Sequence, residues 1–119
     1  MIVRAEQPGD VTAIAAVTAA AFAGMPYSDG SEPAIIDRLR DAGALAVSLV
    51  AENYGFVIGH VAFSPVTFSS GEADWYALGP VSVLPEYQGQ GIGAQLIRDG
   101  LEAIKGLDAG GCVLLGEPA

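Results

Sequence analysis

The sequence carries little positive charge. Five lysines and arginines stand against 14 aspartates and glutamates, which gives a formal net charge of −9. Proteins that bind nucleic acid usually present a basic face, so this balance argues against a nucleic-acid partner. An acidic surface attracts cationic partners, but acidity also serves solubility, and we take solubility as the simpler explanation.

Cysteine and histidine occur once each, as Cys112 and His60. A single cysteine cannot form an internal disulfide, which agrees with a reducing, cytoplasmic location. Metal sites usually combine several paired histidines, cysteines or carboxylates, so we expect no metal. The sequence also contains no Gly-x-Ser-x-Gly motif, which argues against a hydrolase of the nucleophile-elbow type.

Long apolar runs are missing as well. No run reaches the roughly 18 residues that a membrane-spanning helix needs. The opening stretch MIVRAEQPGD has no apolar segment of the kind found in secretory signals. We therefore expect no membrane partner.

The chain is nevertheless apolar enough to build a core, because 51% of its 119 residues are hydrophobic. This length favours one domain over residues 1–119. Hydrophobic periodicity predicts the order β-α-α-β-β-β-α-β, a mixed α/β sheet in which an antiparallel meander precedes one parallel crossover. The expected strands are 1–5, 44–52, 56–68, 75–84 and 111–119, and the expected helices are 8–24, 31–43 and 91–105.

Local signals refine these elements. Asp10 and Ser31 are expected to cap the first two helices with their side chains. The tripeptide NYG at 53–55 predicts a hairpin between two strands. Gly79-Pro80 interrupts an otherwise continuous strand pattern, and proline cannot donate to a strand ladder, so a bulge or an exposed edge is expected there.

The stretch LPEYQGQGIG at 84–93 joins a predicted strand to a predicted helix and places a glycine at every second position. Glycine allows positive φ and close approach to the main chain. The start of a helix presents free N–H groups and the positive end of a dipole, which together favour phosphate or diphosphate. We expect the backbone of residues 88–93 to hold such an anion. A tight turn that needs glycine for geometry alone is the simpler alternative.

Two familiar phosphate motifs fit less well. A Walker motif requires Lys-Ser/Thr after the glycines, and these residues are absent from the loop. The dinucleotide-binding pattern fits in part, since Gly89-x-Gly91-x-x-Ala94 follows a strand and opens a helix. That fold usually begins with the motif, however, whereas here an antiparallel meander precedes it.

The stretch VSVLPEYQGQGIGAQLI resembles motif A of the GCN5-related N-acetyltransferases, in which a strand, a Gln/Arg-x-x-Gly-x-Gly/Ala loop and a helix follow one another. Gln88, Gly91 and Gly93 occupy the motif positions. The order of elements along the whole chain is also similar to the first two thirds of that family's fold.

The resemblance implies that acetyl-CoA is the acyl donor. Its diphosphate would lie on the main chain of Gln88, Gly89, Gln90, Gly91, Ile92 and Gly93. Its pantetheine arm would bond main-chain groups around Val81 and Val83, next to the bulge at Gly79-Pro80. An amine would attack the thioester directly in a ternary complex, and the N–H of Val81 would stabilise the oxyanion.

Other side chains have candidate roles, each beside a simpler structural explanation. Glu86 could act as a base through water, or be a solvated loop acid. Tyr27 and Asp29 lie where family members often contact the acceptor, and Asp29 could hold a cationic amine or serve a turn. His60 could titrate near neutrality as a base, although a lone strand histidine is more often structural. Cys112 could carry an acyl group but is better explained as a small buried residue.

The chain departs from the family pattern at its end, because members usually add a further helix and hairpin after the last strand. The tyrosine that often protonates the CoA thiolate belongs to that part. A bare edge on the last strand would favour pairing with a second copy of the chain, hence a homodimer. Two functions therefore stay open: an N-acetyltransferase acting on an amine, and a CoA-binding module without catalysis.

Overall fold

The computed structural model describes residues 1–26, 28–67, 70–71 and 74–114. Within these residues, five strands form one sheet in the order β1-β2-β3-β4-β5. The strands are β1 (Ile2–Ala5), β2 (Val47–Asn53), β3 (Phe56–Val66), β4 (Trp75–Val83) and β5 (Gly111–Leu114). The helices are α1 (Val11–Phe22), α2 (Glu32–Asp41) and α3 (Ile92–Lys105), with 3-10 turns at Pro8–Asp10 and Pro85–Tyr87.

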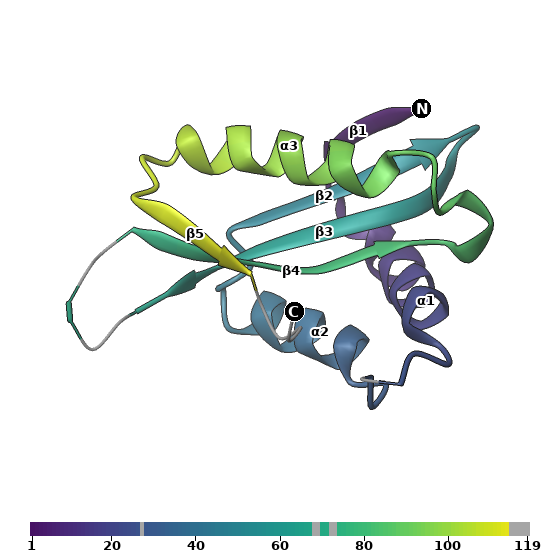
Figure 1. Ribbon diagram of the computed structural model, residues 1–119, viewed down its shortest axis with the longest axis horizontal. Helices are drawn as coiled ribbons and strands as arrows, with labels where there is room; N and C mark the ends of the chain where they lie inside the picture. The colour runs from purple at the N-terminus through teal and green to yellow at the C-terminus, as the bar shows by residue number, and fades with distance from the viewer. Residues whose placement is uncertain (27, 68–69, 72–73, 115–119) are drawn as a thin grey trace.

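The sheet separates two helical layers. Helix α3 covers one face, and α1 and α2 cover the other (Figure 1). The pairs β1–β2, β2–β3 and β3–β4 are antiparallel, whereas β4–β5 is parallel. This is the predicted mixed sheet, and its element order confirms the fold class. Because only one described pair is parallel, the dinucleotide-binding alternative is wrong: it requires a mostly parallel sheet.

Two apolar cores fill the space on either side of the sheet. The larger one lies under α3, where Leu96 and the ring of Phe63 are both fully buried. The smaller one brings together Ile14 of α1, Ile36 of α2 and Val50 of β2. Gly100 of α3 lies directly over Phe63, and a Cβ at this position would overlap the phenyl ring. The helix can therefore approach the sheet closely at this point only because residue 100 has no side chain.

The predicted hairpin is confirmed. Asn53 pairs with Phe56, and the two residues between them, Tyr54 and Gly55, have φ of 51° and 81°. Positive φ at both central positions is the pattern of a type I′ turn, whose twist matches that of the flanking strands.

The two predicted side-chain caps are wrong, although the helices begin where expected. Asp10 and Ser31 occupy the N-cap positions of α1 and α2, yet neither side chain bonds the helix start. The carboxylate of Asp10 instead accepts from the main-chain N–H of Gln7 at 2.7 Å and from Arg4 at 2.8 Å. A charged partner from β1 offers a stronger hydrogen bond than a neutral helix amide does.

Among the described residues, no helix is long and apolar enough to cross a membrane.

Candidate functional site

The predicted bulge in β4 is confirmed and marks the beginning of the site. Val61 pairs with Val81 and Phe63 pairs with Leu78, so Gly79 and Pro80 together oppose a single residue of β3. Gly79 has φ of 136°, a conformation that favours glycine. The described part of β5 pairs with β4 only from Trp75 to Leu78. Parallel pairing thus reaches the bulge, and the described residues place no strand beside β4 beyond it.

Beyond the bulge, one edge of β4 faces away from β3. Leu84 donates its main-chain N–H to the carbonyl of Ile58 at 2.9 Å. Because hydrogen-bonded pairs alternate along an antiparallel ladder, the main-chain groups of Ser82 also point to β3. The N–H groups of Val81 and Val83 then point to the opposite edge. This edge can accept an extended ligand in place of a strand.

The loop after β4 exposes its main chain. It forms a 3-10 turn at Pro85–Tyr87 and continues through Gly89 and Gly91, whose φ values are 80° and 83°. A Cβ at either glycine would meet nothing within 4 Å. Glycine is therefore required at both positions by backbone conformation, and the surface above them is open.

The start of α3 supplies free donors beside this open surface. Gly91 is the N-cap residue, and no side chain caps the helix. The helical hydrogen bonds begin with Gln95 N to Gly91 O at 3.0 Å. The N–H groups of Ile92, Gly93 and Ala94 consequently have no acceptor within the helix. They lie at the positive end of the helix dipole, which favours an anion.

Gln88 connects the loop to the strand. Its side-chain amide donates to the carbonyl of Val83 at 3.0 Å, so the side chain turns back to β4. This bond uses the outward-facing carbonyl next to the free edge and fixes the distance between loop and strand. The three segments that motif A would require, namely strand edge, loop and helix start, are therefore adjacent in the structure.

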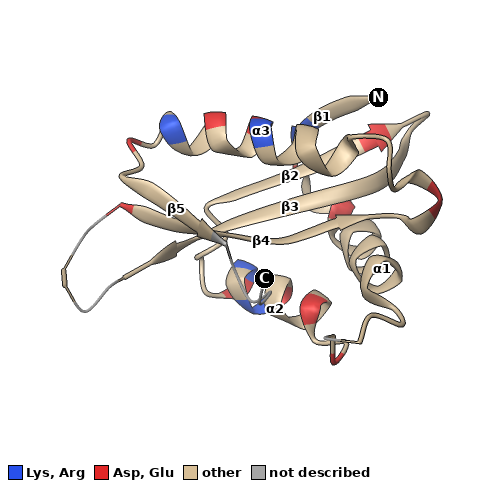
Figure 2. Cartoon of the chain, in the orientation of Figure 1, with Lys and Arg blue, Asp and Glu red and all other residues tan. Residues whose placement is uncertain are grey.

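The loop holds no cationic side chain (Figure 2). Residues 84–93 include no lysine or arginine, and Glu86 is exposed within the 3-10 turn. The nearest basic residue further along the chain is Arg98, which donates to Gln95 at 3.0 Å. An anion at this loop would therefore be held by main-chain amides rather than by side-chain charge.

The predicted acceptor residues are only partly described. Tyr27 lies outside the described residues. Asp29 is exposed, and its carboxylate accepts from the main-chain N–H of Ser31 at 3.0 Å. Hydrogen bonding to Ser31 lowers the pKa of Asp29. The carboxylate is thus ionised near neutrality and already serves the turn before α2.

His60 does not fit the role of a base near neutrality, and the structure favours the simpler explanation that this strand histidine is structural. The side chain is fully buried, and burial lowers its pKa from 6.5 to about 4. The ring is therefore neutral at pH 7. Its Nε2 lies 2.7 Å from the hydroxyl of Ser48, which in turn donates to Glu6 at 2.6 Å.

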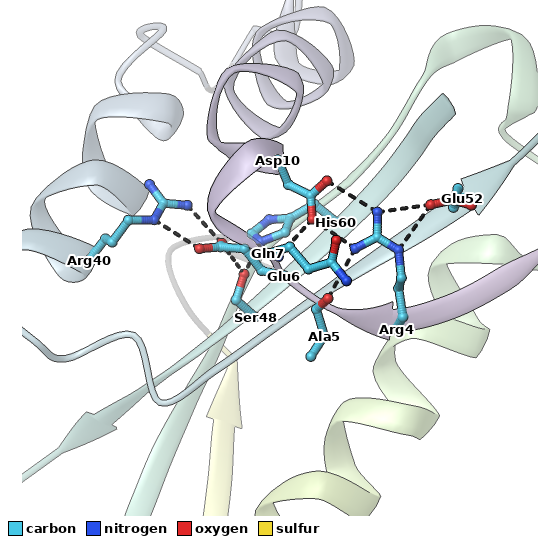
Figure 3. Close-up of polar contacts among 9 residues, drawn as sticks. All are labelled: Arg4, Ala5, Glu6, Gln7, Asp10, Arg40, Ser48, Glu52 and His60. Atoms are coloured by element: carbon cyan, nitrogen blue, oxygen red, sulfur yellow. Dashed lines mark hydrogen bonds and ion pairs between the residues drawn. The ribbon is translucent and has the colours of Figure 1, made fainter. Parts of the chain in front are cut away.

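Glu6 joins this histidine to a surface arginine. Arg40 donates to both carboxylate oxygens of Glu6, at 2.8 Å and 3.0 Å (Figure 3). Although burial raises the pKa of Glu6, the bonds from Arg40 and Ser48 lower it overall. Sequence reasoning missed this network. The available signal was a polar residue between apolar or small neighbours in each of three strands, namely Ser48, His60 and Ser82.

Cys112 is only partly buried, whereas the sequence predicts a small buried residue. Burial nevertheless raises the pKa of its thiol. Since the thiolate is the nucleophilic form, this environment does not favour an acyl carrier. The side chain borders a groove between α3 and β5, together with Leu101 and Lys105. Among the described residues, no group of three His, Cys, Asp or Glu side chains could hold a metal ion.

Comparison with known proteins gives consistent matches. A model of the "Acetyltransferase (GNAT) family" matches residues 13–117. The uncharacterized N-acetyltransferase YhbS of Escherichia coli K12 is 35% identical over 120 residues, which span 100% of this chain and 69% of the relative.

Two solved structures extend this similarity. A GNAT family acetyltransferase from Brucella melitensis, solved in complex with acetyl-CoA, is 53% identical with a TM-score of 0.94, over 99% of this chain and 77% of that one. Escherichia coli YhbS, solved in complex with CoA, is 33% identical with a TM-score of 0.87, over 98% of this chain and 63% of that one.

Proposed function

Because the chain belongs to the acetyltransferase (GNAT) family, we propose that it transfers the acetyl group of acetyl-CoA to a primary amine of a small molecule or a protein. The observation that carries this proposal is the adjacency of three features: a free strand edge, a glycine loop and an uncapped helix start. Two similar proteins were solved with acetyl-CoA or CoA bound, which supports the choice of acyl donor.

In the proposed complex, the diphosphate of CoA lies against the main chain of residues 88–93. The N–H groups of residues 89–93 supply the donors, because that of Gln88 donates to the carbonyl of Pro85 at 3.3 Å. The neighbouring edge of β4 accepts the pantetheine arm through main-chain groups of Val81 and Val83, as an added strand would pair. The length of the arm then places the thioester near the bulge. Binding through amides needs no lysine or arginine, which agrees with the composition of the loop.

The proposed reaction is a direct transfer. The lone pair of the amine attacks the carbonyl carbon, the C–S bond breaks, and the sulfur leaves as a thiolate that takes up a proton. The N–H of Val81 donates to the oxygen on which negative charge develops, an interaction worth roughly 10²- to 10³-fold in rate. Holding both reactants side by side supplies a further large share of the acceleration.

Proton removal from the amine needs a base, and we propose Glu86 acting through water. Its carboxylate is exposed and lies one 3-10 turn before the diphosphate loop. Asp29 is proposed to attract a cationic acceptor, with Tyr27 beside it in sequence. If Glu86 is the base, Glu86→Gln lowers kcat by about 10²-fold and leaves CoA affinity unchanged. Unchanged kcat in this variant would remove Glu86 from the mechanism.

The diphosphate site is tested by Gln90→Glu. Gln90 is exposed between two loop glycines, so the change keeps the shape of the side chain and adds one negative charge. An acid near a helix start is neutral or favourable for folding. Repulsion of the diphosphate at about 5 Å is worth about 1 kcal/mol, which raises the Kd for CoA by about fivefold or more.

Lys105→Gln provides a matched control. It changes the net charge by the same amount at the far end of α3, about 20 Å away, and this distance exceeds the Debye length of about 8 Å in physiological salt. Calorimetry should show weakened CoA binding in Gln90→Glu alone. Equal effects in the two variants would mean that net charge matters and that the loop is not the site.

Turnover separates catalysis from binding alone. Incubation with acetyl-CoA and a panel of primary amines should release free CoA thiol and produce acetylated amine. A chain that binds CoA tightly and acetylates no amine in the panel would support the CoA-binding module instead.

We further propose that residues 1–119 form one domain and that two copies pair through β5. One cooperative unfolding transition is expected for a single domain. Solution mass from light scattering is expected to correspond to two chains, and a mass of one chain at micromolar concentration would contradict the pairing.

A further inference from the structure

Two buried polar atoms lie behind the proposed thioester site. Among the described residues, Nδ1 of His60 and Oγ of Ser82 are buried side-chain atoms without a hydrogen-bond partner. The two side chains are 0% and 1% exposed. A buried polar group without a partner destabilises a fold, so such atoms usually bond another group or an internal water.

The strand register places these two residues side by side. His60 and Ser82 are directly opposed in the β3–β4 ladder. Opposed residues extend to the same face of a sheet, with Cβ atoms about 5 Å apart. A hydroxyl and an imidazole at this separation can bond directly or share one water.

The remaining hydrogen bonds determine which atom must donate. Glu6 is paired with Arg40 and is therefore an ionised acceptor. The single hydroxyl proton of Ser48 is used in the bond to Glu6. Ser48 can then only accept from His60, so Nε2 of the ring carries the proton. A neutral imidazole with its proton on Nε2 has a bare lone pair on Nδ1.

Ser82 is the complementary group, because its hydroxyl can donate to that lone pair. We propose that Ser82 donates to Nδ1 of His60, directly or through one internal water, and that this bond positions the segment of β4 that faces the thioester. Val81 and Val83 flank Ser82, and their outward N–H groups depend on how residue 82 is held. Ser82 and His60 are thus positioning residues rather than catalytic ones.

The bond completes a chain of hydrogen bonds from β4 to the surface. It runs from Ser82 to His60, Ser48 and Glu6 and ends at Arg40 on α2. Each step joins a different element, so the chain ties β4 to β3, β2, the segment after β1, and α2. The role in positioning the thioester rests on the proposed function, whereas the bond itself does not.

Two readouts test the bond without any assay of activity. His60 is the only histidine in the sequence, so its ring nitrogens can be observed without ambiguity in a ¹⁵N-histidine sample. At pH 7 we expect a protonated Nε2 and an unprotonated Nδ1 that accepts a hydrogen bond. A proton on Nδ1 would overturn the proposal.

Removal of the Ser82 hydroxyl changes the stability of the fold in opposite directions, depending on whether that hydroxyl is hydrogen-bonded. If Ser82 donates to His60, Ser82→Ala leaves the lone pair of Nδ1 buried without a donor. The unfolding equilibrium constant then rises about fivefold to tenfold. If the hydroxyl has no partner, the same change lowers that constant. Urea unfolding measures the sign directly, and a more stable variant would overturn the proposal.

Kinetics then test the positioning role. With any amine that the wild type acetylates, Ser82→Ala should lower kcat about tenfold and raise the Kd for CoA by a smaller factor, because the diphosphate contacts are unchanged. Thr18→Val is a matched control, since it removes a buried hydroxyl whose bond to Ile14 O is local to α1. Unchanged kcat in Ser82→Ala would refute the role. Absence of turnover in the wild type would count against the proposed function. The tautomer of His60 and the stability of Ser82→Ala would still show whether Ser82 donates to His60.

Discussion

Acidification from pH 7 to pH 5 is expected to destabilise the folded protein because of His60. The pKa of this ring is lowered from 6.5 to about 4, mainly by burial; Glu6 opposes the shift and Arg40 adds to it. Between pH 7 and pH 5, His60 binds a proton in the unfolded chain but stays largely unprotonated in the folded chain. The unfolding free energy therefore falls as the pH falls.

The size of the effect follows from the difference in pKa. One pKa unit corresponds to about 1.4 kcal/mol, so complete passage through this window removes about 3 kcal/mol of stability. About 2 kcal/mol of that loss is expected between pH 7 and pH 5. The carboxylates of Glu6 and Asp10 also have lowered pKa values, from 4.5 and 3.8. These two carboxylates stabilise the fold fully at pH values above 4.5 and 3.8, and their contribution to the unfolding free energy is lost only as the pH falls below those values.

Urea unfolding at pH 7, 6 and 5 measures this dependence, with the single tryptophan as the fluorescent probe. His60→Gln is the matched variant, because glutamine keeps a donor and an acceptor but does not titrate. Its stability should be nearly constant over the same range. A wild-type protein that is equally stable at pH 7 and pH 5, or a glutamine variant with the same slope, would refute the assignment of a buried neutral histidine.

Further predictions concern packing, charge and ligand chemistry. Gly100→Ala should destabilise by about 1–3 kcal/mol, because the new methyl group overlaps the ring of Phe63, despite the better helix propensity of alanine. Gly93→Ala is its control, since a Cβ there makes only ordinary contacts of 3.8 Å and more, and equal thermal unfolding of the two variants would contradict the packing. Arg4→Met should raise the pKa of Asp10, whose carboxylate loses its main bonding partner, and an unchanged Asp10 titration by NMR would show that the pair is unimportant. Removal of divalent metal by EDTA should leave acetyl transfer unchanged, and a loss that zinc or magnesium restores would introduce a metal into the mechanism.

Much of the fold could be predicted because its signals are local. The tripeptide around Tyr54-Gly55 specifies its own turn, since residues in a two-residue hairpin need positive φ whatever surrounds them. Gly79-Pro80 marks its bulge for a similar reason, because proline cannot donate to a ladder in any context. The loop at 84–93 combines glycine spacing with a strand before it and a helix after it, and these features depend on neighbouring residues only.

The failures come from interactions between residues of different elements. Asp10 is a residue type that often caps helices, but its carboxylate accepts a hydrogen bond from Arg4 of the preceding strand instead. The buried network links Arg40 to Glu6 across 34 residues, and Ser48 to Glu6 across 42. Such pairs follow from strand register and helix placement. Periodicity indicates which face a residue occupies, but not which partner it meets there.

NMR titration of the amide groups tests the central claim most directly, because each proposed donor is observed separately. Coenzyme A should shift the amides of residues 89–93 together with those of Val81 and Val83, saturably and with one Kd. Pantetheine, which lacks the diphosphate, should shift only the amides of β4. If CoA at saturating concentration leaves the amides of residues 89–93 unmoved, or shifts only residues along the groove between α3 and β5, the helix start does not bind the diphosphate.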